Sequence, residues 1–279
     1  MDGDPAHGAA GHGGFIQFPS GSFTPDPASL GSFDRAFSKW LPVPRAWISP
    51  DGKRYAYSVN PPGNGPQTGT IHLVDVATGS DRPFLVPSTS NVVSFEAEGV
   101  YIAHVVPNSG APPTGLTLVD ANTGSYRQIA AAGTWSAIVG GSAWGADLDS
   151  SIAPPANAGP GAANRIRKLD LKAGVVTAQL PSPGVNVQVL GPDAGQAVIA
   201  YGQSVNGPAY SIGRTDGVKM FTAESVSTSN PAAPIVSDNG AIWFSSQSSA
   251  LWLWDSPQTG VREVATGPPQ GAVVAGTCR

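Results

Sequence analysis

The sequence predicts an all-β protein built from repeated four-stranded sheets, and three observations lead to this prediction. Charged residues make up only 12% of the 279 residues, which is about half the usual share. The chain holds 35 Gly and 27 Pro, both above the average for globular domains. The segment LVDVATGSDR at 73–82 returns almost unchanged as LVDANTGSYR at 118–127. Abundant turn formers and few charged helix formers favour short strands joined by tight turns.

The repeated segment contains a hairpin turn that recurs along the chain every 43 to 50 residues. Each copy places a glycine between two apolar, strand-like runs. Glycine enters the left-handed backbone region without steric cost, as a type I turn with a following bulge requires. An aspartate starts most copies, and its carboxylate can cap free amides of the turn. The glycines are Gly79, Gly124, Gly174, Gly217 and Gly260, and the aspartates are Asp75, Asp120, Asp170 and Asp255, with Gly213 in this place in the fourth copy.

A second pair of strand-like runs precedes each hairpin turn. The clearest pair is AWISPDGKRYAYSVN at 46–60, where Tyr55, Tyr57 and Val59 alternate onto one face. The other pairs occupy 92–106, 135–148, 187–202 and 234–246. Each unit therefore contains about four strands, and this length and strand number are typical of one blade of a β-propeller.

The SPDG turn at 49–52 and the D-x-x-T-G ending at 75–79 resemble the TolB-like and WD40-like repeats of bacterial β-propellers. The resemblance covers 46–267, most clearly in the first unit. It implies the propeller architecture and says little about activity, because this fold carries many unrelated functions.

The two ends of the chain supply strands for one more blade. AVVAG at 272–276 has the pattern of an inner strand without partners, and GFIQFPSGSF at 14–23 has that of two outer strands. We therefore expect six four-stranded blades, the sixth closed by the N- and C-terminal strands, because closure removes open sheet edges. A five-bladed ring is the alternative. Residues 1–13 are expected to be a disordered leader and 14–279 a single domain, with a short helix over 32–45 capped by Ser32.

Composition also limits the classes of binding partner and the cellular location that we expect. The net charge is −4 and the largest basic cluster is RIRK at 165–168, so a nucleic-acid partner is not expected. No apolar run approaches the length that spans a bilayer. The N-terminus has no signal-peptide pattern, and we interpret it as the segment that remains after removal of a signal or behind a lipid anchor, which places the protein outside the cytoplasm. Cys278 is the only cysteine; it is either a small apolar residue of the closing strand or a reactive or intermolecular thiol.

The sequence contains no recognisable metal or cofactor motif. His7, His12, His72 and His104 have no metal-ligand spacing, and no phosphate loop, GxSxG or CxxC occurs. We therefore expect no metal and no cofactor. Asp51, Asp193 and Asp238 occupy equivalent turn positions, and their repetition favours a role in the turns.

Four residues depart from the repeat and are candidates for ligand binding. Glu96 and Glu98 lie two apart in SFEAEG, where they share one face of a strand. Trp135 opens a predicted inner strand, and Asp147 begins the insertion at 146–164. We expect all four to border one surface near the channel mouth, with the insertion as a mobile flap. The alternative is that the carboxylates are simply solvated and the insertion is a linker.

These features favour a non-catalytic recognition or scaffold propeller that binds a protein or glycan. The alternative is a propeller hydrolase or lyase acting on a carbohydrate or small molecule, with Glu96 or Asp147 among its acids. An enzyme needs two or three titratable groups converging on one pocket, whereas a binding module spreads its contacts over a face. The sequence leaves the ligand and the oligomeric state open.

Overall fold

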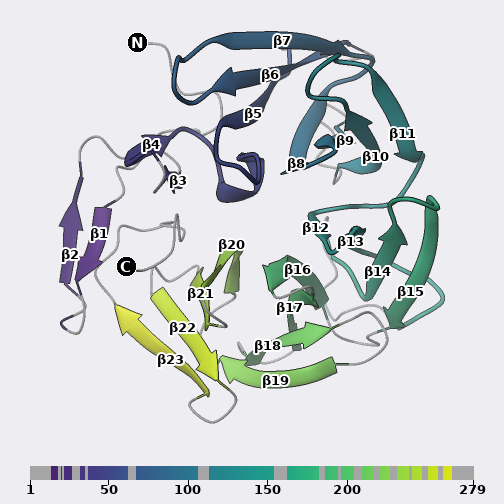
Figure 1. The fold of residues 1–279 in the computed structure, drawn as a ribbon. Helices are drawn as coiled ribbons and strands as arrows, with labels where there is room; N and C mark the ends of the chain where they lie inside the picture. The colour runs from purple at the N-terminus through teal and green to yellow at the C-terminus, as the bar shows by residue number, and fades with distance from the viewer. Residues whose placement is uncertain are drawn as a thin grey trace. The chain divides into compact units, whose positions relative to one another are not determined.

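The computed structural model confirms an all-β protein of antiparallel sheets (Figure 1). It describes residues 14–17, 20, 22–26, 32–34, 37–61, 67–105, 113–153, 162–181, 186–193, 196–203, 209–215, 220–226, 231–238, 241–246, 251–256 and 260–265. These residues group into two compact units. The first unit holds the described residues of Ala28–Trp135, and the second holds those of Gly11–Pro27 and Ser136–Arg279.

The first unit contains two large sheets. One is the three-stranded sheet β5(Arg54–Val59)-β6(Gly69–Asp75)-β7(Asp81–Val86), where an isolated bridge from Ile48 to Tyr55 stands in place of a full first strand. The other is the four-stranded sheet β8(Ser90–Glu96)-β9(Gly99–His104)-β10(Thr114–Val119)-β11(Tyr126–Ala130). Strands that are consecutive in the chain are therefore neighbours in each sheet, as the repeat predicted.

The second unit contains three four-stranded sheets of the same kind and one hairpin. The sheets are β12(Ala137–Val139)-β13(Ser142–Asp147)-β14(Arg165–Asp170)-β15(Val175–Pro181), β16(Asn186–Asp193)-β17(Gln196–Gln203)-β18(Ala209–Thr215)-β19(Met220–Val226), and β20(Pro231–Asp238)-β21(Ala241–Ser246)-β22(Leu251–Ser256)-β23(Gly260–Ala265). The hairpin pairs β1(Gly14–Gln17) with β2(Ser22–Pro25). The first strand β16 contacts both β12 and β20, so the three sheets of this unit pack in chain order with their first strands adjacent.

The repeated hairpin turns have the predicted backbone geometry. Gly79, Gly124, Gly174 and Gly260 all have φ between 64° and 75°, a region that only glycine enters freely. The side chain of Asp75 accepts a hydrogen bond from the amide of Thr78 at 2.7 Å, and Asp120 and Asp170 cap the equivalent amides. Gly217 lies outside the described residues.

The SPDG turn is also confirmed and its aspartate caps it, whereas the side chain of Asp238 lies outside the described residues. Gly52 has φ 72°, and Asp51 accepts hydrogen bonds from the Ser49 hydroxyl and the Lys53 amide. Asp193 instead is 3% exposed and accepts hydrogen bonds from Arg214 of β18 and Ser237 of β20. It therefore links two neighbouring sheets.

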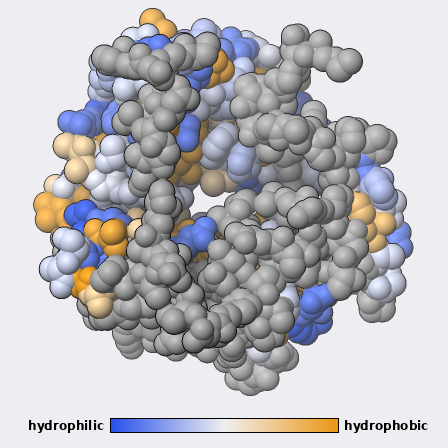
Figure 2. Space-filling model, turned by 180° about the vertical axis from the view of Figure 1, so that it is seen from behind, coloured by the Kyte–Doolittle hydropathy of each residue, from blue (hydrophilic) through white to orange (hydrophobic). Residues whose placement is uncertain are grey.

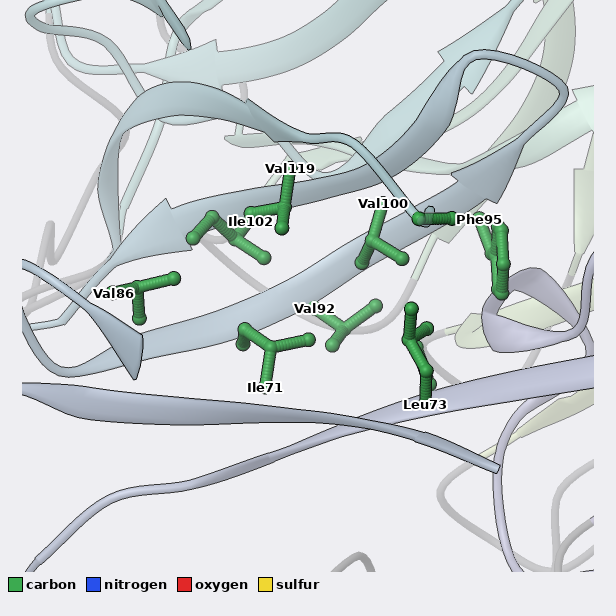
Figure 3. Packing of buried hydrophobic residues seen from close by; sticks show 10 residues of the cluster. Ile71, Leu73, Val86, Val92, Phe95, Val100, Ile102 and Val119 are labelled. Carbon is green, nitrogen blue, oxygen red and sulfur yellow. The ribbon is translucent and has the colours of Figure 1, made fainter. Parts of the chain in front are cut away.

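Hydrophobic side chains fill the space between the two sheets of the first unit. Ile71 and Leu73 of β6 point toward Val92, Val100 and Ile102 of the next sheet (Figure 3). Between the last two sheets of the second unit the core is more aromatic. There Phe244, Trp252 and Trp254 pack with Val198 and Ile212, and the guanidinium of Arg214 lies 4.2 Å from the centre of the Trp254 ring.

The helix expected over 32–45 is wrong, because these residues form a β-hairpin. β3(Ser32–Asp34) pairs with β4(Lys39–Leu41), with Phe33 opposite Trp40, and a short 3-10 turn η1(Arg45–Trp47) follows. A helix of this length is marginal without strong packing of one face. The hairpin instead buries Leu41, which packs with Val43 in a cluster that also includes the rings of Tyr55 and Tyr57.

Each sheet has two different ends. At the "turn end" the first strand turns into the second and the third into the fourth; in sheet β8–β11 these turns are 97–98 and 120–125. At the opposite "loop end" the second strand runs into the third, and the chain enters from the preceding sheet. In the first three sheets the connections at the loop end from second to third strand are longer than either turn: they span 60–68, 105–113 and 148–164.

The remaining expectations concern the termini and the surface. The closing strand at 272–276, Cys278 and the leader 1–13 lie outside the described residues. Among the described residues visible in Figure 2, strongly hydrophobic colour occurs in small separate areas. Within the part of the chain that the structure describes, no helix has the length and apolar character needed to cross a membrane.

Candidate ligand-binding and acid–base residues

Glu96 and Glu98 lie at the turn end of sheet β8–β11. Glu96 ends β8, and Glu98 belongs to the two-residue turn before β9. The hydroxyl of Ser94 donates a hydrogen bond to the Glu96 carboxylate. Burial raises the pKa of Glu96 above its usual value, and the nearby negative charge of Glu98 raises this pKa further. Glu96 is therefore held in surroundings that favour its protonated form.

Tyr101 adds a third ionisable group to this end of the sheet. It lies opposite Ser94 in the β8–β9 pairing and is 3% exposed. Burial, together with the charges of Glu98 and Glu96, raises the pKa of the Tyr101 hydroxyl to about 12. Two acidic side chains and a neutral phenol thus share one environment.

Trp135 lies just before β12, and its ring is buried rather than presented to a ligand. The side chain is 3% exposed, and its indole Nε1 donates a hydrogen bond to the carbonyl oxygen of Ala132 at 3.2 Å. Gly133 lies under the ring, where a β-carbon would come within 2.9 Å of it. Trp135 therefore shapes the segment that leads into β12.

Asp147 is held by two arginines from the neighbouring strand. It ends β13, the second strand of its sheet rather than the inner strand, and lies opposite Arg165. The Arg165 guanidinium binds it through Nε at 2.7 Å and Nη2 at 2.9 Å, and Arg167 Nη1 lies 3.1 Å from the same carboxylate. Such a two-point contact holds the carboxylate in one orientation.

Arg165 also binds a residue at the start of the long connection 148–164. Arg165 Nη1 donates to Asp149 at 2.6 Å. Asn164 is fully buried; its side chain accepts a hydrogen bond from the Asp149 amide at 2.7 Å and donates one to the Asp149 carbonyl at 3.0 Å. The base of this connection is therefore rigidly closed, while 154–161, which would form the predicted flap, lie outside the described residues.

The four sequence-predicted residues fall into both units of the structure. Glu96, Glu98 and Trp135 belong to the first unit, and Asp147 belongs to the second. Within their own sheets, Glu96 and Glu98 lie at the turn end and Asp147 at the loop end. The expectation that all four border one ligand-binding surface stays a prediction; it is an alternative to the loop-end binding proposed below, and the same variants distinguish the two.

The structure also contains a polar cluster that the sequence pattern did not reveal. His104 is the last residue of β9, the second strand of its sheet. Asp147 is likewise the last residue of β13, the second strand of the next sheet. The Ser88 hydroxyl lies 2.5 Å from His104 Nδ1, and the Thr117 hydroxyl lies 3.2 Å from Nε2. These partners are 16 and 13 residues away, so only the pairing of strands brings them to the imidazole. Burial lowers the pKa of His104 below its usual value.

No metal centre is formed by the described residues, among which no three His, Cys, Asp or Glu side chains are grouped to hold an ion. His72 Nδ1 lies 2.8 Å from Asp81 Oδ2. The ring of His72 stacks on Tyr57 with a centroid distance of 4.7 Å.

Comparison with known proteins identifies the fold. No family model matches the chain, and no curated protein matches it. Among solved structures, the chain is similar to the β-propeller domain of the Trilobed protease from Pyrococcus furiosus, with 11% identity and a TM-score of 0.50 over 77% of this chain and 68% of that chain. An acylaminoacyl peptidase from Pyrococcus horikoshii is matched at 13% identity and a TM-score of 0.38, over 76% of this chain and 46% of that one. The first likeness shows a β-propeller fold, and at this identity it shows the fold alone.

Proposed function

We propose that this chain is a recognition or scaffold propeller that binds a protein or glycan ligand through the loop ends of its sheets. The observation that carries the proposal is the contrast between the two ends. The turn ends are closed by short turns whose amides are capped by Asp75, Asp120 and Asp170. The loop ends carry the long connections 60–68, 105–113 and 148–164, which are rich in Pro, Gly and Asn. Long connections on a rigid scaffold are where binding residues concentrate.

The ion pairs of Asp147 with Arg165 and Arg167 support a binding function rather than carbohydrate hydrolysis. A glycosidase needs a carboxylic acid that can donate a proton and a second carboxylate beside it. Asp147 and Asp149 are neighbours, but Arg165 contacts both at 2.6–2.7 Å. In the proposal these arginines and carboxylates anchor the connection that meets the ligand.

The finer architecture belongs to the same proposal. We infer a six-bladed, TolB-like propeller in which the terminal strands complete the sixth blade, with five blades as the alternative. The SPDG turn and the four left-handed turn glycines support this. Removing 268–279 should lower the melting temperature sharply, whereas removing 1–13 should change it little. A C-terminal truncation that melts like the full chain would overturn the six-bladed assignment.

A location outside the cytoplasm is proposed from the N-terminal sequence and is tested by fractionating the native host.

The binding proposal is tested by screening the full chain on a glycan array and a peptide array. For any hit, two variants are compared: one with 106–112 replaced by a Gly/Ser linker, and the double variant Glu96→Gln/Glu98→Gln at the turn end. The loop variant should weaken binding at least about tenfold, and the turn-end variant should bind like the wild type. The reverse result would contradict the proposal.

The reverse result would favour the second candidate, in which the turn end of β8–β11 is the site. The raised pKa of Glu96 beside Glu98 supports this candidate, because a carboxyl group with such a shift can act as a general acid. Hydrolysis of a chromogenic glycoside that is lost in Glu96→Gln would establish it.

A further inference from the structure

The cluster around His104 has the arrangement of an activated hydroxyl group. Ser88 Oγ lies 2.5 Å from His104 Nδ1, and Thr117 Oγ1 lies 3.2 Å from Nε2 on the other side of the ring. Ser88 and His104 are partly exposed, whereas Thr117 is 2% exposed. A nucleophile hydrogen-bonded to a base, with the base oriented by a third group, is the general pattern of a covalent catalytic site.

Hydroxyl groups contact both ring nitrogens of His104, and such groups can donate or accept a hydrogen bond. The Ser90 hydroxyl donates to the carbonyl oxygen of Ser88 at 3.0 Å, and it lies farther from Nδ1, at 3.4 Å. One tautomer has Nδ1 accepting the hydrogen bond of Ser88 and Nε2–H donating to Thr117, and this is the tautomer on which the proposal below rests. In this tautomer the neutral imidazole can take the proton of Ser88.

The segment that carries Ser88 is held rigidly from both sides. Asn60, just past the end of β5, accepts a hydrogen bond from the Ser90 amide at 2.8 Å and donates one to the Ser90 carbonyl at 3.0 Å. Thr89 is bonded to Val105 twice: its carbonyl accepts from the Val105 amide at 2.9 Å, and its hydroxyl donates to the Val105 carbonyl at 2.6 Å. Supporting contacts of this kind keep a reactive side chain in one geometry.

Two glycines lie close to the pair. A β-carbon on Gly69 would come within 2.8 Å of the Ser88 carbonyl oxygen, and one on Gly115 would come within 3.2 Å of His104 Cδ2. The strands on either side of the Ser88–His104 pair thus approach it closely at positions without side chains.

We propose that Ser88 is a nucleophile that accepts an acyl group from small activated esters, with His104 as its base. Ser88 Oγ attacks the ester carbonyl and forms a C–O bond while its proton passes to His104 Nδ1. The C–O bond to the leaving alcohol then breaks, and the alcohol leaves with the proton from His104. The product is an acyl ester on Ser88 and a neutral imidazole. Water activated by the same nitrogen releases the carboxylic acid. Thr117 is a positioning residue, since its hydroxyl contacts His104 Nε2 and not the reacting oxygen.

The partners of His104 restrict the substrate class. Among the described residues they are hydroxyl groups, and a neutral hydroxyl stabilises an imidazolium less than a carboxylate does. The base is therefore weak, and the reaction requires a leaving group that departs without much assistance. This points to activated esters rather than amides. The activity goes beyond the proposed recognition function, which does not require Ser88.

The experiment mixes the full chain with p-nitrophenyl acetate and follows nitrophenol release and peptide mass spectra. We expect a burst of about one equivalent per chain and an acetyl group on Ser88. Ser88→Ala should abolish the burst, and His104→Gln should slow acylation by roughly 100-fold or more. Ser80→Ala, in the exposed β6–β7 turn, is the matched control and should react like the wild type. Thr117→Val should slow acylation and alter its pH profile, which a purely structural role would not do.

Folding of each variant is checked by circular dichroism and melting. The wild-type rate should rise with pH to a plateau as His104 becomes neutral. Absence of a burst in the folded wild type, an acetyl group on Ser90 or a lysine instead of Ser88, or an unchanged burst in folded Ser88→Ala would each overturn the proposal. Because glycan and peptide binding are measured separately, failure here leaves the binding test standing.

Discussion

The aromatic ring of Phe84 in β7 lies against Gly124 in the turn between β10 and β11. A β-carbon on Gly124 would overlap this ring, whose centre lies 4.7 Å from the Arg82 guanidinium. Gly79 holds the same place in the preceding hairpin and has no atom within 4 Å of such a β-carbon. Two copies of one sequence motif therefore have different tolerance for side chains.

The first prediction compares asparagine at these two glycines. Gly79→Asn should cost less than about 1 kcal/mol of unfolding free energy, because Asn tolerates the left-handed region. Gly124→Asn should cost roughly 1–3 kcal/mol more through the clash with Phe84. Urea denaturation measures both. In a Phe84→Ala background the difference between the two substitutions should shrink, and equal costs in the wild-type background would contradict the packing.

The second prediction concerns Glu96. Its pKa is raised in the folded state, so the folded state binds the proton more tightly than the unfolded state does. The stability from this group is therefore present below about pH 4.5, the ordinary value, and is lost as pH rises through the folded pKa. Glu96→Gln should raise the melting temperature at pH 7 and weaken this decline. Glu98→Gln is the control and should have a smaller effect; a lower melting temperature for Glu96→Gln would refute the assignment.

His104 should give the opposite pH dependence. Burial lowers its folded pKa, so the unfolded state binds the proton more tightly. The stability is complete above the ordinary value of about 6.5 and is lost as pH falls from there through the folded pKa. The melting temperature of the wild type, compared with His104→Gln from pH 7.5 to 5, measures this. Parallel curves for the two proteins would exclude His104 as the titrating group.

The fourth prediction tests the link between sheets β16–β19 and β20–β23. Arg214 Nε lies 2.5 Å from Asp193, whose side chain is 3% exposed. Arg214→Ala leaves this carboxylate without its cation and should cost about 3–5 kcal/mol. The double variant Asp193→Asn/Arg214→Ala should be less destabilised than Arg214→Ala alone, as measured by denaturant unfolding. A double variant that is less stable than the single one would show that the charge is not the cause.

The sequence was informative where the structure is local. Gly79 and Asp75 are four residues apart and define their turn by themselves, and the alternation of Tyr55 and Tyr57 identifies a strand face. The helix expected over 32–45 failed because Phe33, Phe37 and Trp40 suit a helical stripe, yet Leu41 gains more burial when the segment pairs as β3–β4.

The candidate sites were harder to predict because their partners are distant in sequence. Asp147 meets Arg165 through the register of β13 and β14, and no spacing rule indicates that register in advance. Ser88 and His104 come together only because the β8–β9 pairing brings Ser90 opposite His104. The sequence showed two glutamates at 96 and 98 that depart from the repeat. It did not show the burial that raises the pKa of Glu96.

Every described sheet is made of strands that follow one another directly in the chain. The pairing partners are therefore separated by short stretches, and the loop-closure entropy for each pairing is small. Low contact order of this kind speeds folding compared with all-β proteins whose sheets exchange distant strands. A sheet such as β8–β11 can therefore form soon after its last strand leaves the ribosome, before the C-terminal half has been made. The repeat thus sets the order in which the protein assembles as well as its final shape.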